Sequence, residues 1–191
     1  MLEGRYFVYE DKSTPNPSGP ITFFDIKIGV PDTFPIDQPL VLETGGRIPR
    51  TLDRHIYGEG HCCINVWEEW LVSAADQSFS SYMNGPLRNY FLSQYRFEQT
   101  GEWPFGERAH GYDGLIEAYA ETLGIEVDAA KVKNCLQLLS RKKIKGHWLC
   151  QCGSGKRIRD CHQQIFSELR QKITPEMARR MNSRLIKMEK K

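Results

Sequence analysis

Long hydrophobic runs are missing from this sequence. No stretch of the 191 residues approaches the ~18 apolar residues that a membrane-spanning helix needs. The first residues, Met1 to Arg5, also lack the apolar segment of a signal peptide. We therefore expect a cytoplasmic protein with no membrane partner.

The sequence also lacks the pattern of a disulfide-bonded secreted protein. Its six cysteines are unevenly placed, with clusters at Cys62-Cys63 and from Cys150 to Cys161. In a cytosolic protein such clusters favour metal binding or catalysis over disulfide bonds. Cys135 lies apart from both clusters, on the apolar side of a predicted helix, and we expect it in the core.

The charge is unevenly divided along the chain. Residues 1–130 carry 9 Lys and Arg against 20 Asp and Glu, a charge of −11, whereas residues 131–191 carry 17 against 4, a charge of +13. This break predicts one domain over residues 1–128 and a basic helical region over residues 129–191. A basic tail can bind nucleic acid or an acidic protein surface, or simply face solvent. We expect docking on an acidic surface, and we do not expect nucleic acid as a partner.

The apolar pattern predicts an α+β protein with an antiparallel meander sheet. Three segments are rich in β-branched and aromatic residues and are separated by proline- and glycine-containing turns, at residues 2–12, 21–29 and 40–44. An irregular, extended segment is predicted over residues 47–72. Helical spacing of apolar residues follows, with Ser78 or Asp76 as the first cap. The predicted helices cover residues 76–99, 115–123, 131–143, 163–172 and 175–191.

The adjacent pair Cys62-Cys63 follows a glycine-bounded turn, Gly58 to Gly60. Neighbouring cysteines rarely bridge each other, because the disulfide geometry is strained. In an extended segment their side chains point to opposite faces, so one would be buried and the other presented. A presented cysteine beside histidines is a candidate nucleophile. The alternative is that both cysteines are small buried hydrophobic residues.

The surrounding sequence resembles the active-site signature of ubiquitin-conjugating enzymes. That signature is His-Pro-Asn, a short turn, Gly-x-Ile-Cys-Leu and a tryptophan about two turns later. Here the matching residues are His55, Gly60, Cys63-Ile64 and Trp70. The resemblance is greatest to a divergent bacterial branch of the family, often encoded beside anti-phage defence genes.

The upstream chain resembles the same family. Residues 21–28 and 30–42 are similar to the family's central strands and to the proline-rich crossing between them. The resemblance covers roughly residues 1–125 and implies a fold like that of ubiquitin-conjugating enzymes. It implies that Cys63 carries a protein C-terminus as a thioester and passes it to an amine. The implied partners are a ubiquitin-like modifier or protein C-terminus, an activating enzyme and, by analogy with bacterial operons, a cyclic-nucleotide synthase.

The sequence departs from the family at two places. His55-Ile56-Tyr57 replaces His-Pro-Asn, so the asparagine that stabilises the oxyanion is absent from its position. Tyr57 or Asn65 is the candidate replacement, and the family implies a mainly structural role for His55. The second departure is at the amino terminus, where residues 1–9 predict a strand instead of the family's first helix. A glycine-rich loop further on carries His110, which is a candidate to face Cys63.

Two other classes of function remain open at this point. In one, Cys63 is inert and the protein is a scaffold that acts through a metal module and its basic tail, as the missing asparagine suggests. In the other, Cys63 and a histidine form a hydrolase that cleaves instead of joining. A trapped thioester on Cys63 separates transfer from both alternatives.

The second motif lies near the carboxyl end. Cys150, Cys152, Cys161 and His162 supply four soft or borderline ligands within 13 residues, the number that a tetrahedral structural zinc needs. The spacing resembles the SEC-C motif, a small zinc module, and predicts a structural Zn²⁺ site over residues 146–163. A disulfide from Cys150 or Cys152 to Cys161 is the alternative. A phosphate-binding loop is excluded because Gly153-Ser-Gly-Lys156 lacks the required glycine spacing.

Overall fold

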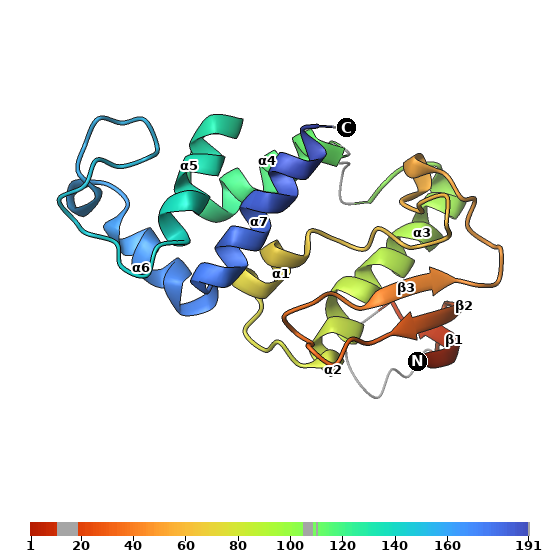
Figure 1. The fold of residues 1–191 in the computed structure, drawn as a ribbon. Helices are drawn as coiled ribbons and strands as arrows, with labels where there is room; N and C mark the ends of the chain where they lie inside the picture. The colour runs from red at the N-terminus through yellow and green to blue at the C-terminus, as the bar shows by residue number, and fades with distance from the viewer. Residues whose placement is uncertain (11–18, 105–108, 110, 191) are drawn as a thin grey trace. The chain divides into compact units, whose positions relative to one another are not determined.

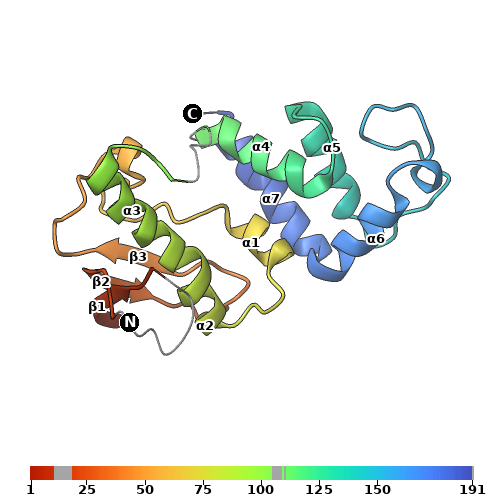
Figure 2. The same ribbon diagram turned by 180° about the vertical axis from the view of Figure 1, so that it is seen from behind.

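The structure, a computed structural model, describes residues 1–10, 19–104, 109 and 111–190. It is an α+β fold, shown from opposite sides in Figures 1 and 2. The chain divides into two compact units. The first comprises Met1–Trp67 and Ala74–Glu107, and the second comprises Glu68–Ser73 and Arg108–Lys191.

The first unit contains an antiparallel sheet, as the sequence predicts. Among the described residues it has three strands in the order β1-β2-β3, so strands adjacent in the sequence are paired. Alternate residues of β2, including Phe24, Ile26 and Ile28, are buried because successive side chains of a strand face opposite sides. The strands are β1 (Leu2–Val8), β2 (Thr22–Gly29) and β3 (Leu40–Glu43).

A long helical segment packs on this sheet. Phe91, which is fully buried, lies with its ring 4.8 Å from that of Phe24 and 5.5 Å from that of Tyr6. The Ser78 hydroxyl accepts a hydrogen bond from the Ser81 N–H at the start of the segment, which confirms the predicted cap. The parts of the segment are α2 (Phe79–Tyr82), a π-helical turn η2 (Met83–Leu87) and α3 (Arg88–Thr100).

Pro86 lies inside the π-helical turn η2. Proline lacks the N–H group that a regular helix would use, and its ring crowds the preceding turn. A wider turn accommodates both effects without ending the helix. The predicted helix over residues 76–99 is therefore observed as one helical path with a local irregularity at its only described proline.

The predicted extended segment over residues 47–72 is wrong at its end. It contains a short 3₁₀ turn, η1 (Leu52–Arg54), and then the helix α1 (Trp67–Ser73). Glu68 and Glu69 occupy the first turn of α1, where negative charge is favourable beside the unpaired N–H groups. The sequence does not predict this helix, because the aromatic residues Trp67 and Trp70 are also common in strands.

The second unit is helical in its described part. Its core contains fully buried residues from three helices, among them Tyr119, Leu136 and Met181. Asp128 and Thr174 cap α5 and α7, and Pro175 takes the first position of α7, where its missing N–H costs no hydrogen bond. Cys135 is fully buried, which confirms its predicted place in the core. The elements are α4 (Gly111–Leu123), α5 (Ala129–Leu139), η3 (Ile158–Asp160), α6 (Gln163–Lys172) and α7 (Pro175–Met188).

The observed division differs from the boundary predicted at residue 128. Helix α4 was expected in the first domain, but it belongs to the second unit, where it packs against α5 and α7. Its apolar residues Leu115, Ile116 and Leu123 are buried. The change in charge at residue 131 marks where basic residues come to outnumber acidic ones, whereas the unit boundary follows the burial of apolar side chains.

Candidate functional site

The two adjacent cysteines face different environments. The Cys62 N–H donates to the Val41 carbonyl (2.8 Å), and the Cys63 N–H donates to the His55 carbonyl (2.7 Å). This pairing extends the chain between β3 and the 55–56 segment, so the side chains alternate. Cys62 is 8% exposed, whereas Cys63 is partly exposed. The predicted pattern of one buried and one presented cysteine is confirmed.

Burial keeps the Cys62 thiol neutral. Desolvation raises its pKa to about 11, against a partial lowering by a hydrogen bond with Tyr90. The reactive form of cysteine is the thiolate, which is scarce at neutral pH when the pKa is this high. Cys62 is therefore suited to a packing role, and Cys63 is the member of the pair that can react with a large partner.

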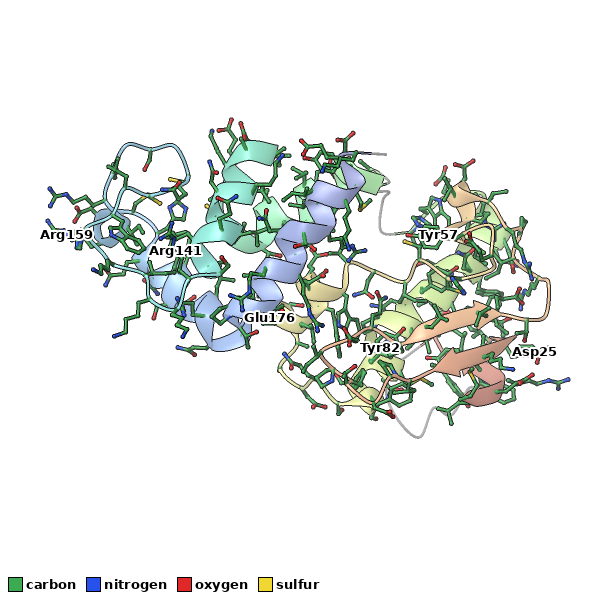
Figure 3. All side chains as sticks on the ribbon, in the orientation of Figure 1. Asp25, Tyr57, Tyr82, Arg141, Arg159 and Glu176 are labelled. Atoms are coloured by element: carbon green, nitrogen blue, oxygen red, sulfur yellow. The ribbon has the colours of Figure 1, made fainter. Side chains whose placement is uncertain are left out.

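Tyr57 lies directly against Cys63. Its hydroxyl donates a hydrogen bond to the Cys63 Sγ over 3.4 Å, and the residue is 44% exposed (Figure 3). A tight turn makes this approach possible, because the Gly60 N–H donates to the Tyr57 carbonyl and the Tyr57 N–H to the His61 carbonyl. Gly60 has φ +88°, a conformation that glycine adopts without steric cost.

His55 supports the site through its backbone. It adopts the left-handed conformation (φ 50°, ψ 37°), and its carbonyl accepts hydrogen bonds from the Cys63 N–H and from the Tyr90 hydroxyl (3.1 Å). Its ring packs edge-on against Trp103 at 4.9 Å. Sequence reasoning missed Tyr90 and Trp103, since each lies at least 35 residues from His55 and meets it only in the folded unit.

Asn65, another candidate residue of this site, is placed less favourably than Tyr57. The Asn65 Nδ2 donates to the neighbouring Val66 carbonyl (3.1 Å), and its Oδ1 is buried with no hydrogen-bond partner among the described residues. The NH₂ group of the Asn65 side chain is thus already hydrogen-bonded to the next residue in the chain. His110 lies outside the described residues.

The second candidate site is a cluster of four side chains in the carboxyl-terminal unit. The ligand atoms of Cys150, Cys152, Cys161 and His162 all lie within 4.8 Å of one another, so the cluster could hold a metal ion. The Cys152 and Cys161 sulfurs are 3.6 Å apart, and the Cys150 sulfur is 3.4 Å from the His162 Nδ1. Two sulfur ligands of a tetrahedral ion at about 2.3 Å would be about 3.8 Å apart, so the cluster has the size of a four-ligand site.

The contacts around the cluster leave the Nδ1 atom of His162 available to bind a metal ion. Its Nε2 lies 3.1 Å from the Gly124 carbonyl, which can only accept a hydrogen bond. The proton therefore resides on Nε2, and Nδ1 is left with a lone pair beside the Cys150 and Cys161 sulfurs, at 3.4 and 3.0 Å. The sequence motif did not indicate Gly124, because this residue precedes the motif by 26 residues and directly follows the end of α4.

The thiols of the cluster differ in acidity. Burial opposes ionisation of Cys152, but hydrogen bonds from the Ser154 hydroxyl and N–H outweigh it and lower the pKa to about 6. Desolvation raises the pKa of Cys150 to about 12. One thiol of the cluster is thus available as a thiolate at neutral pH, the form that binds a metal ion.

Part of the chain is similar to proteins named apolipoprotein N-acyltransferase. Three proteins named apolipoprotein N-acyltransferase, from the Pseudomonas aeruginosa strains PAO1, LESB58 and UCBPP-PA14, are each 28% identical to it over 102 residues. That stretch is 53% of this chain but only 20% of each relative. The chain thus spans a small part of the curated relatives that it matches.

No family model matches the chain, and no solved structure matches it. Within the described residues, no helix has the length and apolar character that crossing a membrane requires.

The two adjacent cysteines should differ in reactivity. The thiolate fraction falls tenfold for each pH unit below the pKa, so a pKa of about 11 in place of 9 makes Cys62 about a hundredfold less reactive than an ordinary thiol. At neutral pH iodoacetamide should therefore modify Cys63 well before Cys62. Peptide mapping by mass spectrometry over a time course measures both rates. Equal rates, or faster modification of Cys62, would contradict the assignment.

Proposed function

We propose that this chain is a cysteine acyltransferase that resembles ubiquitin-conjugating enzymes, with the corresponding fold in its first unit. It would carry a protein C-terminus as a thioester on Cys63 and pass it to an amine. The observation that carries the proposal is the environment of Cys63, the presented cysteine of an adjacent pair, with the Tyr57 hydroxyl 3.4 Å from its sulfur. Such a cysteine suits an acyl group attached to a large partner.

The reaction has two steps with the same sulfur. The Cys63 thiolate attacks the activated carboxyl carbon of the incoming protein, and the original leaving group departs, which leaves a thioester on Sγ. An amine then attacks the same carbon, the C–S bond breaks, and the thiolate is regenerated as the amide forms. Sulfur suits both steps, because thiolate is a good nucleophile and a good leaving group.

Tyr57 is the residue best placed to stabilise the oxyanion in each step. Negative charge develops on the carbonyl oxygen as the tetrahedral intermediate forms at Sγ, and a hydroxyl donor beside the sulfur can reach that oxygen. Asn65 is less suited, because its Nδ2 already donates to the Val66 carbonyl. His55 would act as a support, since its carbonyl holds the Cys63 N–H.

The metal that fits the second cluster best is zinc. Three thiolates and one imidazole form a common donor set of structural zinc sites, and four protein ligands leave no open position for water or substrate. Zn²⁺ would therefore be structural, and Cys150, Cys152, Cys161 and His162 would hold it. When bound, it supplies folding free energy to a loop with little apolar surface.

The biological setting rests on the resemblance of the sequence to bacterial conjugation proteins. That resemblance supports anti-phage defence as the setting and a cyclic-nucleotide synthase as a partner, by analogy. A scaffold in which Cys63 is inert is the second candidate, and the tyrosine in place of the family's asparagine is the observation that favours it.

A trapped thioester tests the assignment of Cys63. The purified protein is mixed with ubiquitin bearing a C-terminal mercaptoethanesulfonate thioester, and adducts are separated without reductant. We expect an adduct that dithiothreitol removes, that Cys63→Ala abolishes and that Cys62→Ala retains at reduced yield. No adduct with the parent protein would favour the scaffold, and release of free ubiquitin without an adduct would favour hydrolysis. An adduct lost only in Cys62→Ala would show that the assignment is wrong by one residue.

The Tyr57 hydroxyl should matter more than the Tyr57 ring. Loss of one oxyanion donor typically slows a reaction by about a hundredfold or more, so Tyr57→Phe should slow single-turnover transfer to that extent. Asn65→Ala is the comparison variant and should change the rate by less than about fivefold, apart from any loss of stability. A rate for Tyr57→Phe equal to that of the parent would remove the hydroxyl from the mechanism.

Removal of one sulfur should release the metal. Elemental analysis of the purified protein should give one zinc per chain, and Cys161→Ser should lower that content strongly and expose the chain near residues 145–159 to protease. Cys135→Ala is the matched control, because it removes a buried thiol outside the cluster and should keep the zinc. A different metal would overturn the choice of zinc. A metal-free protein that resists protease in this segment would overturn the site itself.

A further inference from the structure

The Cys62 thiol lies in the core of the first unit and takes no part in the proposed transfer. It is hydrogen-bonded to the hydroxyl of Tyr90, a residue of α3 that is 6% exposed. The Tyr90 hydroxyl also lies 3.1 Å from the His55 carbonyl, which accepts the Cys63 N–H over 2.7 Å. A continuous series of hydrogen bonds within the first unit therefore connects the buried thiol of Cys62 to the backbone of Cys63.

The available protons determine the direction of each bond in this series. A backbone carbonyl can only accept, so the Tyr90 hydroxyl donates its single proton to His55. The Tyr90 oxygen is then left to accept a proton from the Cys62 thiol. Burial raises the pKa of Cys62 to about 11, so the thiol keeps this proton at neutral pH. Cys62 is thus a permanent donor beneath the active segment.

The His55 carbonyl needs such support because its residue is in an unfavourable conformation. His55 has φ 50° and ψ 37°, the left-handed region, which is costly for a residue with a side chain. Each hydrogen bond to its carbonyl offsets part of that cost. If His55 returned to the right-handed region, the carbonyl would turn away and the Cys63 N–H would lose its acceptor.

Helix α3 also holds the residue before His55. Gln94 is fully buried, donates from Nε2 to the Arg54 carbonyl (2.8 Å) and accepts from the Arg54 side chain (2.9 Å). Residues four apart share one face of a helix, so Tyr90 and Gln94 bind two consecutive carbonyls. Loss of the Tyr90 hydroxyl would therefore release the His55 carbonyl, while Gln94 keeps the segment attached to the helix.

We propose that Tyr90 and Cys62 are positioning residues for Cys63. Cys62 supports the Tyr90 hydroxyl, the hydroxyl holds the His55 carbonyl, and the carbonyl holds Cys63 by its backbone. Position 62 thus needs a hydrogen-bond donor, which an apolar residue of similar size would not supply. The effect on acyl transfer rests on the proposed function, whereas the effect on the Cys63 backbone does not.

Hydrogen–deuterium exchange of single backbone amides, followed by NMR in the full chain, tests the backbone effect. The Cys63 amide reports its bond to the His55 carbonyl. The amide of residue 62 is the internal reference, because it lies in the same segment but donates to the Val41 carbonyl (2.8 Å). Single-turnover transfer from the ubiquitin thioester is measured on the same proteins.

Four variants separate the hydrogen bonds from packing. Tyr90→Phe removes only the hydroxyl, Cys62→Ala removes the thiol, and Cys62→Ser keeps a donor. Tyr82→Phe is the matched control, because Tyr82 is a fully buried tyrosine of α2 whose ring packs 5.5 Å from that of Trp67.

We expect Tyr90→Phe to speed exchange of the Cys63 amide about tenfold and to leave the amide of residue 62 unchanged. Cys62→Ala should speed it about threefold, since it removes only the support of the hydroxyl, whereas Cys62→Ser and Tyr82→Phe should stay within about twofold of the parent. The maximal transfer rate should fall by similar factors, with little change in the concentration for half-saturation.

Parental exchange of the Cys63 amide in Tyr90→Phe would overturn the role of Tyr90. Equal exchange in Cys62→Ala, Cys62→Ser and the parent would overturn the role of Cys62. Faster exchange at both residues 62 and 63 would show a general loosening of the unit, which also overturns the inference. Faster exchange at Cys63 alone, in a set of proteins of which none forms a thioester, would keep the positioning role and reject the proposed transfer.

Discussion

The hydrogen bond from the Cys63 N–H to the His55 carbonyl is the contact on which the candidate active site depends. It requires His55 to adopt a left-handed conformation, which costs free energy for a residue other than glycine. The Tyr90 hydroxyl and the Trp103 ring compensate by holding the carbonyl and the imidazole. Because side chains alternate along this extended segment, the hydrogen bond that holds Cys63 also places the Cys62 side chain in the core.

In the loop of residues 146–162, the corresponding interaction is the cluster of three cysteines and a histidine. Few residues between 146 and 162 are buried, Cys150 and Ile158 among the described ones, so the loop has almost no apolar core. Basic residues such as Arg159 lie on the surface around it, and Arg141 lies with its guanidinium over the Trp148 ring (Figure 3). Metal–ligand bonds can replace apolar burial here, and the Gly124 carbonyl orients the histidine for that purpose.

Much of the fold follows from local patterns in the sequence. The three strands, the cap at Ser78 and the burial of Cys135 depend on neighbours within a few residues, and the sequence predicts each of them correctly. The clustering of the four candidate metal ligands and the alternation of Cys62 and Cys63 are of the same kind. Helix α1 is the exception, because its short run of tryptophans and glutamates suits either a strand or a helix until the surroundings are known.

The sequence by itself thus determined the identity of the presented cysteine and of the candidate metal ligands, since spacing along the chain decides both. Only the tertiary structure decided which groups surround them. The contacts of His162 with Gly124, of His55 with Trp103 and of Glu68 with Arg184 join residues 38 to 116 positions apart. Such contacts arise when buried apolar faces bring elements together, and no local pattern of residues encodes which side chains then meet.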